Sequence, residues 1–399
     1  MNAPILSSLK INLPVADGKL ETFVLSEPLA FPAKTSDTFN RIAFSAAHVV
    51  ADPPADNDPW IDCALDWDTT LRYREYLWDL GLGVAEAMDT AQRGMGLDWP
   101  TSLELIKRAV KAGQAWEARN GRPALLASGC GTDHIDPAQV RSVDEVIAAY
   151  EEQMAAIEAA GGKLIIMASR ALTRIAKSPA DYERVYDRVL SQAKEPVIIH
   201  WLGEMFDPAL AGYWGSADHM QAMKTAVAVI KAHAAKVDGV KISLLDKDKE
   251  IAMRRQLPKG VRMYTGDDFN YAELIAGDAQ GYSDALLGIF DAIAPAASAA
   301  LSALAADKRQ EFDAILKPTV PLSRHIFKAP TRFYKTGVVF MAYLNGLQDH
   351  FTMVGGQQSA RSIVHLSELF RLADRAGLLR NPELARKRMG NVLALNGIA

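Results

Sequence analysis

Eight short apolar runs, separated by longer amphipathic segments, are the feature that most constrains how this chain of 399 residues folds. The runs cover residues 41–50, 83–88, 123–129, 163–169, 196–201, 237–244, 262–268 and 279–285. Helical patterns lie between them, notably over residues 101–116, 142–160, 178–193 and 216–236. Alternating strands and helices are typical of a parallel α/β sheet, and eight repeats favour closure. We therefore predict a (β/α)8 TIM barrel over residues 41–290.

An open, doubly wound sheet with a nucleotide at its switch point is the alternative topology. The glycine-rich signature of that fold is incomplete in this sequence, because "GLGVAE" and "GCGTDH" each lack the third glycine. The sequence also contains no GxxxxGK[ST] phosphate loop. Both observations favour the closed barrel.

The segments on either side of the barrel have different patterns. Residues 9–25, "LKINLPVADGKLETFVL", alternate apolar and polar residues around Asp17-Gly18, so residues 1–40 are predicted to form a β-hairpin and a lead-in. From about residue 285, helical patterns follow one another without strands, which predicts a C-terminal helical extension over residues 291–399. The apolar faces of these helices are broad enough to pack against another subunit, so we expect a homo-oligomer, either a dimer or a tetramer.

Composition excludes several classes of partner. A formal net charge of -4 gives no basic patch for nucleic acid or an anionic membrane surface. No apolar run approaches the ~20 residues needed to cross a bilayer. The two cysteines, Cys63 and Cys130, cannot build a disulfide framework, and the first thirty residues lack the pattern of a secretory signal. We expect a cytoplasmic protein that acts on a small molecule.

One lysine lies within the apolar sixth run, "VDGVKISL". Because side chains alternate along a strand, Val240 and Ile242 are expected to point outward, and Gly239, Lys241 and Ser243 into the barrel. An enclosed lysine has its charged form disfavoured, so its pKa is expected to fall from about 10.4. A neutral amine attacks ketones, which makes Lys241 a candidate nucleophile.

An ion pair is the alternative explanation for Lys241. The lysine would then lie at a strand end and pair with Asp238, Asp267 or another carboxylate, without catalysis. A single lysine does not decide between these two interpretations.

Two motifs bear on this choice. The run "DGVKISLLD", followed by "YTGDDFNYAELIAGDAQGYSDALLGIFDAIAP", resembles the dihydrodipicolinate synthase and N-acetylneuraminate lyase family, in which the sixth strand carries G-(I/V)-K and the seventh ends in a GDD-like turn. Less closely, "EAMDTAQRGMGLDWPTSLELIKRAV" is similar to the GTTGE loop of that family and the helix after it, and "ASGCGTDHIDPAQV" to its third-strand turn. The resemblance covers residues 41–345 and indicates a divergent, uncharacterised branch.

The resemblance implies a class I aldolase-type barrel. In that family the barrel lysine forms a Schiff base with pyruvate or another 2-oxo acid, and Lys241 occupies the matching position. The resemblance therefore implies a carbon-carbon or carbon-oxygen lyase, an aldolase or a dehydratase, whose covalent imine replaces any separate cofactor.

Two departures from the family bear on the substrate and the proton relay. The family usually ends its fourth strand with a tyrosine that relays protons, but "IIMASRAL" offers only Ser169 and Arg170. Only Thr90 matches the two threonines of the GTTGE loop, and Arg93 could bind a carboxylate in compensation. We therefore expect the substrate to be a 2-oxo acid or a keto-sugar derivative, and the sequence does not specify which compound.

The predicted site follows from the rule that barrel enzymes work at the carboxyl ends of their strands. His200 closes the fifth run and is predicted as a general acid/base, although a buried histidine bound to a carbonyl is an equally good account. The predicted catalytic residues are Lys241, His200 and Ser169. The predicted substrate-binding residues are Thr90, Arg93, Asp89, Arg170, Asp267, Asp268 and Tyr282.

Two other functions fit the same barrel. A metal-dependent lyase or isomerase would hold a divalent metal ion through some of its oxygen and imidazole side chains, for which the candidates are Glu86, Asp133, His200 and Asp267. A non-catalytic sugar-acid binding protein would have kept the barrel and lost the chemistry. The missing fourth-strand tyrosine favours this last alternative.

Overall fold

The computed structural model describes residues 5–32 and 39–398. Part of the predicted lead-in, residues 33–38, therefore lies outside the described residues. The chain divides into two compact units, which we describe separately. The barrel unit comprises Arg41–Ala47 and Leu82–Gly288, and the flanking unit comprises Met1–Asn40, His48–Gly81 and Ile289–Ala399. The boundaries predicted from sequence at residues 40 and 290 stay a prediction.

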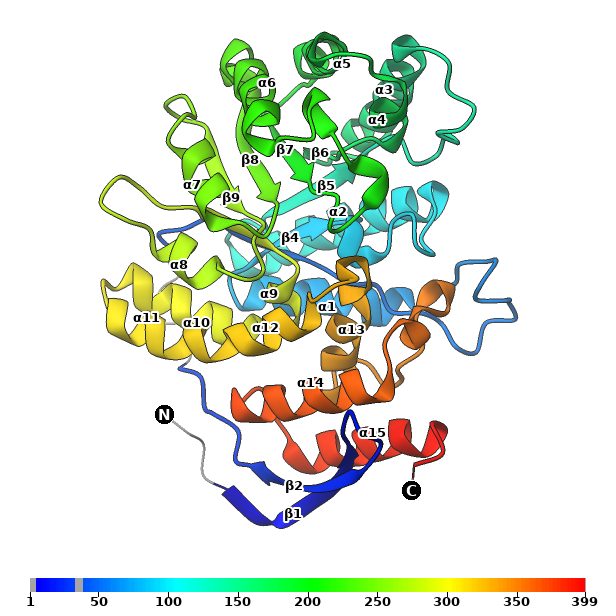
Figure 1. The fold of residues 1–399 in the computed structure, drawn as a ribbon, viewed down its shortest axis with the longest axis vertical. Helices are drawn as coiled ribbons and strands as arrows, with labels where there is room; N and C mark the ends of the chain where they lie inside the picture. Colours follow the sequence, from blue (N-terminus) through cyan, green and yellow to red (C-terminus); the bar gives the residue numbers. More distant parts are fainter. Residues whose placement is uncertain (1–4, 33–38, 399) are drawn as a thin grey trace. The chain divides into compact units, whose positions relative to one another are not determined.

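Eight parallel strands close into a barrel, in the order β10-β3-β4-β5-β6-β7-β8-β9 (Figure 1). Every one of the eight predicted apolar runs contributes one strand, so the predicted TIM barrel is confirmed. The strands are β3 (Ala43–Ala46), β4 (Gly83–Glu86), β5 (Leu126–Cys130), β6 (Leu164–Ile166), β7 (Val197–Leu202), β8 (Val237–Ser243), β9 (Arg262–Thr265) and β10 (Asp284–Leu287).

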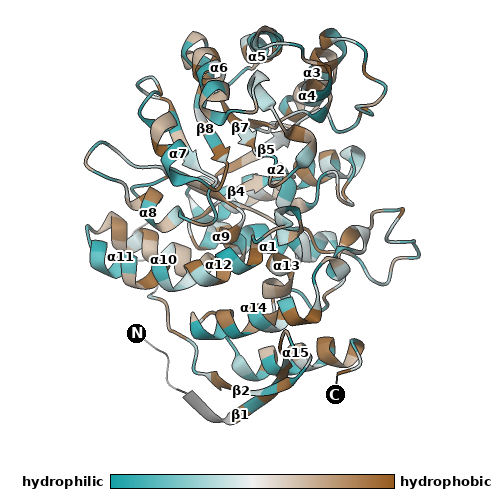
Figure 2. Ribbon diagram, in the orientation of Figure 1, coloured by the Kyte–Doolittle hydropathy of each residue, from teal (hydrophilic) through white to brown (hydrophobic). Residues whose placement is uncertain are grey.

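Seven helices of the barrel unit connect these strands, and each carries both hydrophilic and hydrophobic residues (Figure 2). This pattern is expected of helices that cover a sheet with one face and meet water with the other. The helices are α2 (Trp99–Asn120), α3 (Val143–Ala159), α4 (Arg170–Ile175), α5 (Pro179–Gln192), α6 (His219–Ala232), α7 (Lys247–Arg254) and α8 (Tyr271–Ala276).

Alternation along β8 places its side chains as predicted. A Cβ added to Gly239 would lie 2.5 Å from the ring of Tyr264, which belongs to the core cluster inside the barrel. Lys241, two residues further along β8, therefore shares this inward face. Its side chain is only 7% exposed, which confirms that the lysine is enclosed.

The eighth strand begins later than predicted, and this changes where its flanking residues lie. The sequence pattern placed the run at residues 279–285, whereas β10 spans Asp284–Leu287. Tyr282 thus precedes the strand and lies at its amino end, the opposite end from the catalytic face of a barrel. The turn at Asp278–Gly281, closed by two backbone hydrogen bonds, occupies the stretch that resembled a strand.

The flanking unit contains the N-terminal hairpin and the C-terminal helices, and it confirms both predictions. Strands β1 (Ile5–Pro14) and β2 (Leu20–Ser26) are antiparallel, and Gly18 has the positive φ of 79° that their turn requires. The helices are α1 (Trp67–Asp79), α9 (Ile289–Ala292), α10 (Ala294–Ala305), α11 (Arg309–Leu316), α12 (Val320–Ile326), α13 (Tyr334–Leu344), α14 (Ile363–Arg375) and α15 (Pro382–Leu395).

The hairpin is fixed to α14 by polar and aromatic contacts. Arg371 donates a hydrogen bond to the carbonyl oxygen of Leu13 over 3.2 Å, and Asp374 accepts one from the backbone nitrogen of Ser26 over 3.1 Å.

In the described part of the chain, no helix is both long enough and apolar enough to span a membrane.

Candidate active site

Lys241 stands on the sixth strand of the barrel, beside His200 of β7 in the parallel register. Burial lowers the pKa of the Lys241 ammonium, and the carboxylates of Asp89 and Asp268 partly oppose this effect. Within residues 5–32 and 39–398, no hydrogen bond or ion pair to the ammonium is present. The amine is thus enclosed among polar groups and not locked to any one of them.

Asp238 and Asp267, the two carboxylates named as possible ion-pair partners of Lys241, have other partners. Asp238 accepts hydrogen bonds from Arg262 over 2.7 Å and from the Tyr264 hydroxyl over 2.6 Å. Asp267 accepts from the backbone nitrogens of Phe269 and Asn270, over 2.8 and 3.1 Å. The ion-pair interpretation of Lys241 is therefore wrong for both residues.

The turn after β9, residues 265–268, lies directly against Lys241. Its central residue is Gly266, whose backbone nitrogen donates to the carbonyl oxygen of Ile242 over 3.0 Å. A Cβ at Gly266 would lie 2.9 Å from Cε of Lys241 and 2.6 Å from the same carbonyl oxygen, closer than real Cβ contacts. Glycine is required here because the turn and the lysine side chain leave no room between them.

His200 is completely buried, and its surroundings disfavour the protonated ring. Burial and, secondly, the charge of Lys241 lower the pKa of His200 well below its ordinary value. Its Nε2 lies 3.3 Å from the Ser243 hydroxyl, while its Nδ1 is buried with no hydrogen-bond partner among the described residues. The ring is therefore held neutral, and the general acid/base role of His200 stays a prediction.

A pocket of about 110 Å³ opens at the carboxyl ends of β4 to β7. One water molecule needs about 10–15 Å³ of such space, so the pocket suits a small organic acid. Four of the predicted catalytic and substrate-binding residues line it: Asp89, Arg93, Arg170 and His200. Lys241 is adjacent to this group through His200 and Asp89 but is not itself among the lining residues.

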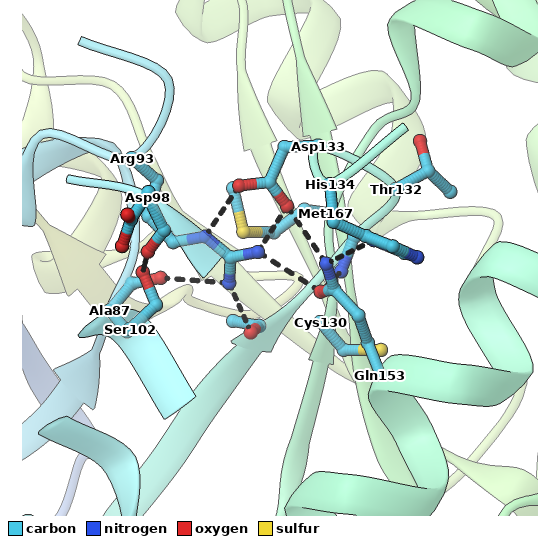
Figure 3. Close-up of polar contacts among 12 residues, drawn as sticks. Ala87, Arg93, Asp98, Ser102, Cys130, Thr132, Asp133, His134, Gln153 and Met167 are labelled. Carbon is cyan, nitrogen blue, oxygen red and sulfur yellow. Dashed lines mark hydrogen bonds and ion pairs between the residues drawn. The ribbon is translucent and has the colours of Figure 1, made fainter. Parts of the chain in front are cut away.

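Arg93 is held in a buried network and has no donor left for a substrate (Figure 3). Its Nε and Nη2 both donate to the carboxylate of Asp133, and Nη2 also donates to Oε1 of Gln153 over 3.0 Å. Its Nη1 donates to the carbonyl oxygens of Gly129 and Ala87, over 2.7 and 3.4 Å. The expectation that Arg93 binds a carboxylate of the substrate is not favoured, because all five N–H groups already have acceptors.

Gln153 on α3 is the residue of this network that the sequence did not reveal (Figure 3). Its Oε1 also accepts from the backbone nitrogen of Gly131 over 2.7 Å, and its Nε2 donates to Asp133 over 3.0 Å and contacts Nδ1 of His134 over 2.9 Å. The available signal was an amide on an otherwise apolar helix face. Together, Arg93 and Gln153 fix the loop that forms one wall of the pocket.

Arg170 differs from Arg93 because its guanidinium is only partly used. Its Nε donates to Asp207 over 2.5 Å, and its side chain is 45% exposed. The Nη1 atom lies 3.5 Å from the position that a Cβ on Gly94 would take, so the side chain reaches across the pocket from α4. Both Nη atoms lack a hydrogen-bond partner among the described residues, which leaves them available to an anion at the pocket.

Ser169 is connected to the pocket through a second hydroxyl. Its Oγ lies 2.7 Å from Oγ1 of Thr132, which lines the pocket, and accepts from the backbone nitrogen of Leu172 over 3.0 Å. Its backbone nitrogen donates to the hydroxyl of Tyr213 over 3.2 Å, and that hydroxyl contacts Tyr186 over 2.9 Å. No sequence pattern indicates that Tyr213, which follows β7, lies behind a residue that follows β6.

The remaining predicted residues fall into two groups. Thr90 and Asp89 lie in the short helix Asp89–Ala91 after β4, and Asp268 follows the Gly266 turn, so these three stay candidates for the site. Tyr282 is 47% exposed, and the guanidinium carbon of Arg41 lies 3.4 Å from its ring centroid. It is not among the residues lining the pocket.

The candidate metal ligands do not converge. In the part of the chain that the structure describes, no three His, Cys, Asp or Glu side chains are grouped as a metal site. Asp133 is bound by Arg93 and Gln153, and Asp267 by its own loop, as described above. The four predicted ligands, Glu86, Asp133, His200 and Asp267, therefore form no ready coordination sphere.

A closed parallel barrel with an enclosed lysine on its sixth strand defines a TIM-barrel protein of the dihydrodipicolinate synthase fold. The chain belongs to the family described as "Protein of unknown function (DUF993)", whose sequence model matches residues 11–398. No curated protein matches the sequence significantly.

Solved structures similar to this chain share its fold at low sequence identity. Dihydrodipicolinate synthase from Aquifex aeolicus has a TM-score of 0.61 at 13% identity, over 86% of this chain and 100% of the other. A putative dihydrodipicolinate synthetase from Pseudomonas aeruginosa has a TM-score of 0.62 at 16% identity, over 84% and 99%. The enzyme from Acinetobacter baumannii, solved in complex with pyruvate, has a TM-score of 0.59 at 15% identity, over 86% and 100%.

Proposed function

We propose that this protein is a class I lyase, aldolase or dehydratase that acts on a 2-oxo acid or a keto-sugar derivative through a Schiff base on Lys241. The observation that carries the proposal is an enclosed lysine that has a lowered pKa and no ion pair to any described residue, next to a pocket sized for a small acid. The family resemblance, with its matching lysine position, supports the same reaction class.

In the proposed reaction, the neutral amine of Lys241 attacks the ketone carbon and a carbinolamine forms. Loss of one water molecule, with uptake of one proton, gives a protonated imine. The imine nitrogen then accepts the electron pair that is released when a carbon-carbon bond breaks or a proton leaves the neighbouring carbon. Because the imine is itself the electron sink, the reaction uses no separate cofactor.

The hydroxyl pair of Ser169 and Thr132 is proposed to move protons between the pocket and the carbinolamine oxygen. A hydroxyl both donates and accepts, and the 2.7 Å separation allows transfer from one to the other. His200, held neutral by burial, is proposed to hydrogen-bond the reacting oxygen without adding a second positive charge beside Lys241. This arrangement would replace the tyrosine that the related family has after its fourth strand.

Arg170 is proposed to hold the anionic group of the substrate, because its Nη atoms face the pocket and Asp207 keeps the side chain in place. Asp89, Thr90, Asp267 and Asp268 would orient substrate hydroxyls or the loops that carry them. Arg93 would act indirectly, by fixing the pocket wall. We further propose that the protein is cytoplasmic and forms a homo-oligomer.

Trapping with borohydride tests the proposal directly. The protein is incubated with pyruvate and with other 2-oxo acids, reduced with borohydride, digested and mapped by mass spectrometry. We expect a reduced adduct on the peptide that contains Lys241. The variant Lys335→Met, which removes another buried lysine, serves as the matched control and should retain the adduct.

Other outcomes would favour the alternative functions. Turnover that a chelator abolishes, without any adduct on Lys241, would support a metal-dependent lyase or isomerase. Saturable binding of 2-oxo acids or sugar acids without adduct or turnover would support a binding protein.

A further inference from the structure

A buried glutamate lies directly behind the turn that packs on Lys241. Glu250 is on α7, the helix after the lysine strand, and is 1% exposed. Its Oε2 accepts a hydrogen bond from the Thr265 hydroxyl over 2.9 Å, and its Oε1 accepts one from the Ser283 hydroxyl over 2.7 Å. Thr265 is the last residue of β9, and Ser283 is the residue before β10. The carboxyl group therefore bridges two neighbouring strands.

The bridge continues into the turn at residues 265–268. The Thr265 hydroxyl that donates to Glu250 also accepts from the backbone nitrogen of Asp267 over 3.2 Å. Gly266, between these two residues, leaves no space between the turn and the side chain of Lys241. The next residue, Asp268, is one of the two carboxylates whose charge acts on Lys241. A displacement of this turn would therefore directly displace the side chain of Lys241.

The charged groups around Glu250 compensate a negative charge on it only in small part. Asp267, on the turn, has the same sign and acts against ionisation. Arg254, on α7, is the facing cation, but its Nη2 donates to Asp278 over 2.8 Å and its Nη1 to the Ser283 hydroxyl over 3.3 Å. Burial, the largest effect, raises the pKa of Glu250 to about 8. The group is therefore mostly a neutral acid at pH 7.

We propose that Glu250 is a positioning residue whose neutral form holds the turn at residues 265–268 against Lys241, and that its ionisation at alkaline pH weakens imine formation. This inference rests on the proposed Schiff-base function of Lys241. An ionised Glu250 repels Asp267 across the Thr265 hydroxyl, so the turn is pushed from its place against the lysine. Glu250 does not touch the substrate and acts only through this turn.

The pH profile of imine trapping in Glu250→Gln tests the proposal, because glutamine resembles the neutral acid at every pH. A single ionisation near pH 8 leaves about one tenth of the protein competent at pH 9. We therefore expect the ratio of wild-type to Glu250→Gln trapping rates to fall about tenfold between pH 7 and pH 9. Glu183→Gln, which changes an exposed glutamate on α5, should keep the wild-type profile.

A second variant fixes the sign of the effect. The Ser283 hydroxyl donates to the carboxylate and favours its charged form, so Ser283→Ala should move the alkaline loss of trapping to higher pH. A structural defect alone would lower trapping equally at all pH values. The proposal is overturned if the Glu250→Gln and wild-type profiles have the same shape, or if Ser283→Ala moves the loss to lower pH.

Thermal unfolding separates this inference from the proposed function. If no variant forms an adduct at any pH, the Schiff-base function fails, and the unfolding temperature still reports whether Glu250 ionises. In that case the wild-type protein should lose stability relative to Glu250→Gln as the pH rises from about 4.5 to about 8. Parallel unfolding curves over this range would refute the ionisation itself.

Discussion

Replacing Lys241 by methionine should make the protein inactive in trapping and more stable at neutral pH. The ammonium is 7% exposed, its pKa is lowered by burial, and no ion pair holds it among the described residues. The methionine side chain is similar in length to that of lysine but carries no charge, so the free-energy cost of burying the charge disappears. Substitutions that relieve such a cost at functional sites commonly stabilise by about 0.5–2 kcal/mol.

The magnitude translates into a measurable shift. For a cooperative unit of roughly 150–250 residues, 1 kcal/mol shifts Tm by about 2–4 °C, so an increase of about 1–8 °C is expected for Lys241→Met. The gain also depends on pH. Between the lowered pKa of Lys241 and 10.5, the unfolded chain binds more protons than the folded one, so wild-type stability rises with pH. The advantage of Lys241→Met should therefore shrink as the pH approaches 10.5.

Lys335→Met is the matched comparison, and its effect should have the opposite sign. Lys335 is also buried, at 4% exposed, but it donates to the carbonyl oxygen of Arg332 over 3.1 Å and lies 4.7 Å from the ring centroid of Tyr334. Loss of a hydrogen bond from a charged donor costs about 1.5–3 kcal/mol. Thermal unfolding of both variants at pH 7 and pH 10 decides the matter. If Lys241→Met is destabilised like Lys335→Met, then Lys241 has a stabilising partner and our reasoning is refuted.

Three further predictions follow from the site. Gly266→Ala should destabilise the protein by about 1–3 kcal/mol and reduce trapping, since its Cβ would lie 2.6 Å from a backbone carbonyl oxygen; unchanged urea unfolding and trapping would contradict this. Asp133→Ala should cost about 3–5 kcal/mol by leaving the buried Arg93 guanidinium without its carboxylate. The exposed pair of Asp144 is the control, and Asp144→Ala should cost only about 0.2–1 kcal/mol in the same urea titration. Above pH 8, the free energy of unfolding of Glu250→Gln should exceed that of the wild type by up to roughly 5 kcal/mol, which corresponds to a pKa of about 8 for Glu250 against the ordinary 4.5. Equal free energies of unfolding for the two proteins at both pH 5 and pH 9 would refute it.

The barrel and its lysine could be predicted from the sequence because both depend on local periodicity. Each strand is buried on two sides, so it appears as a short apolar run, and alternation within β8 orients Lys241 without further information. The end of a run is less well defined. The residues before β10 fit a strand pattern, but a turn at Asp278–Gly281 forms instead, and Tyr282 consequently lies at the amino end of the strand.

The partners of the site residues could not be predicted, because they come from distant parts of the chain. Arg93 has the chemistry of a carboxylate ligand, but Gln153, sixty residues later on α3, helps to use up its donors. The pKa of His200 depends on complete burial beside Lys241, and sequence alone supplies only its ordinary value. Local patterns thus locate candidate groups, whereas tertiary contacts decide which of them remain available.

The buried groups near the pocket have charge states that support one another. Burial drives both Lys241 and His200 toward their neutral forms, and Glu250 behind the turn is also mostly neutral at pH 7. Arg93 carries a charge but shares it with Asp133, so little net charge remains there. In the proposed reaction a 2-oxo acid would bring one negative charge, which Arg170 would meet, and it would consume the amine in forming the imine. The positive charge on the imine nitrogen would then lie near Asp89 and Asp268, the two carboxylates that already act on Lys241, so the same two groups would stabilise the covalent intermediate.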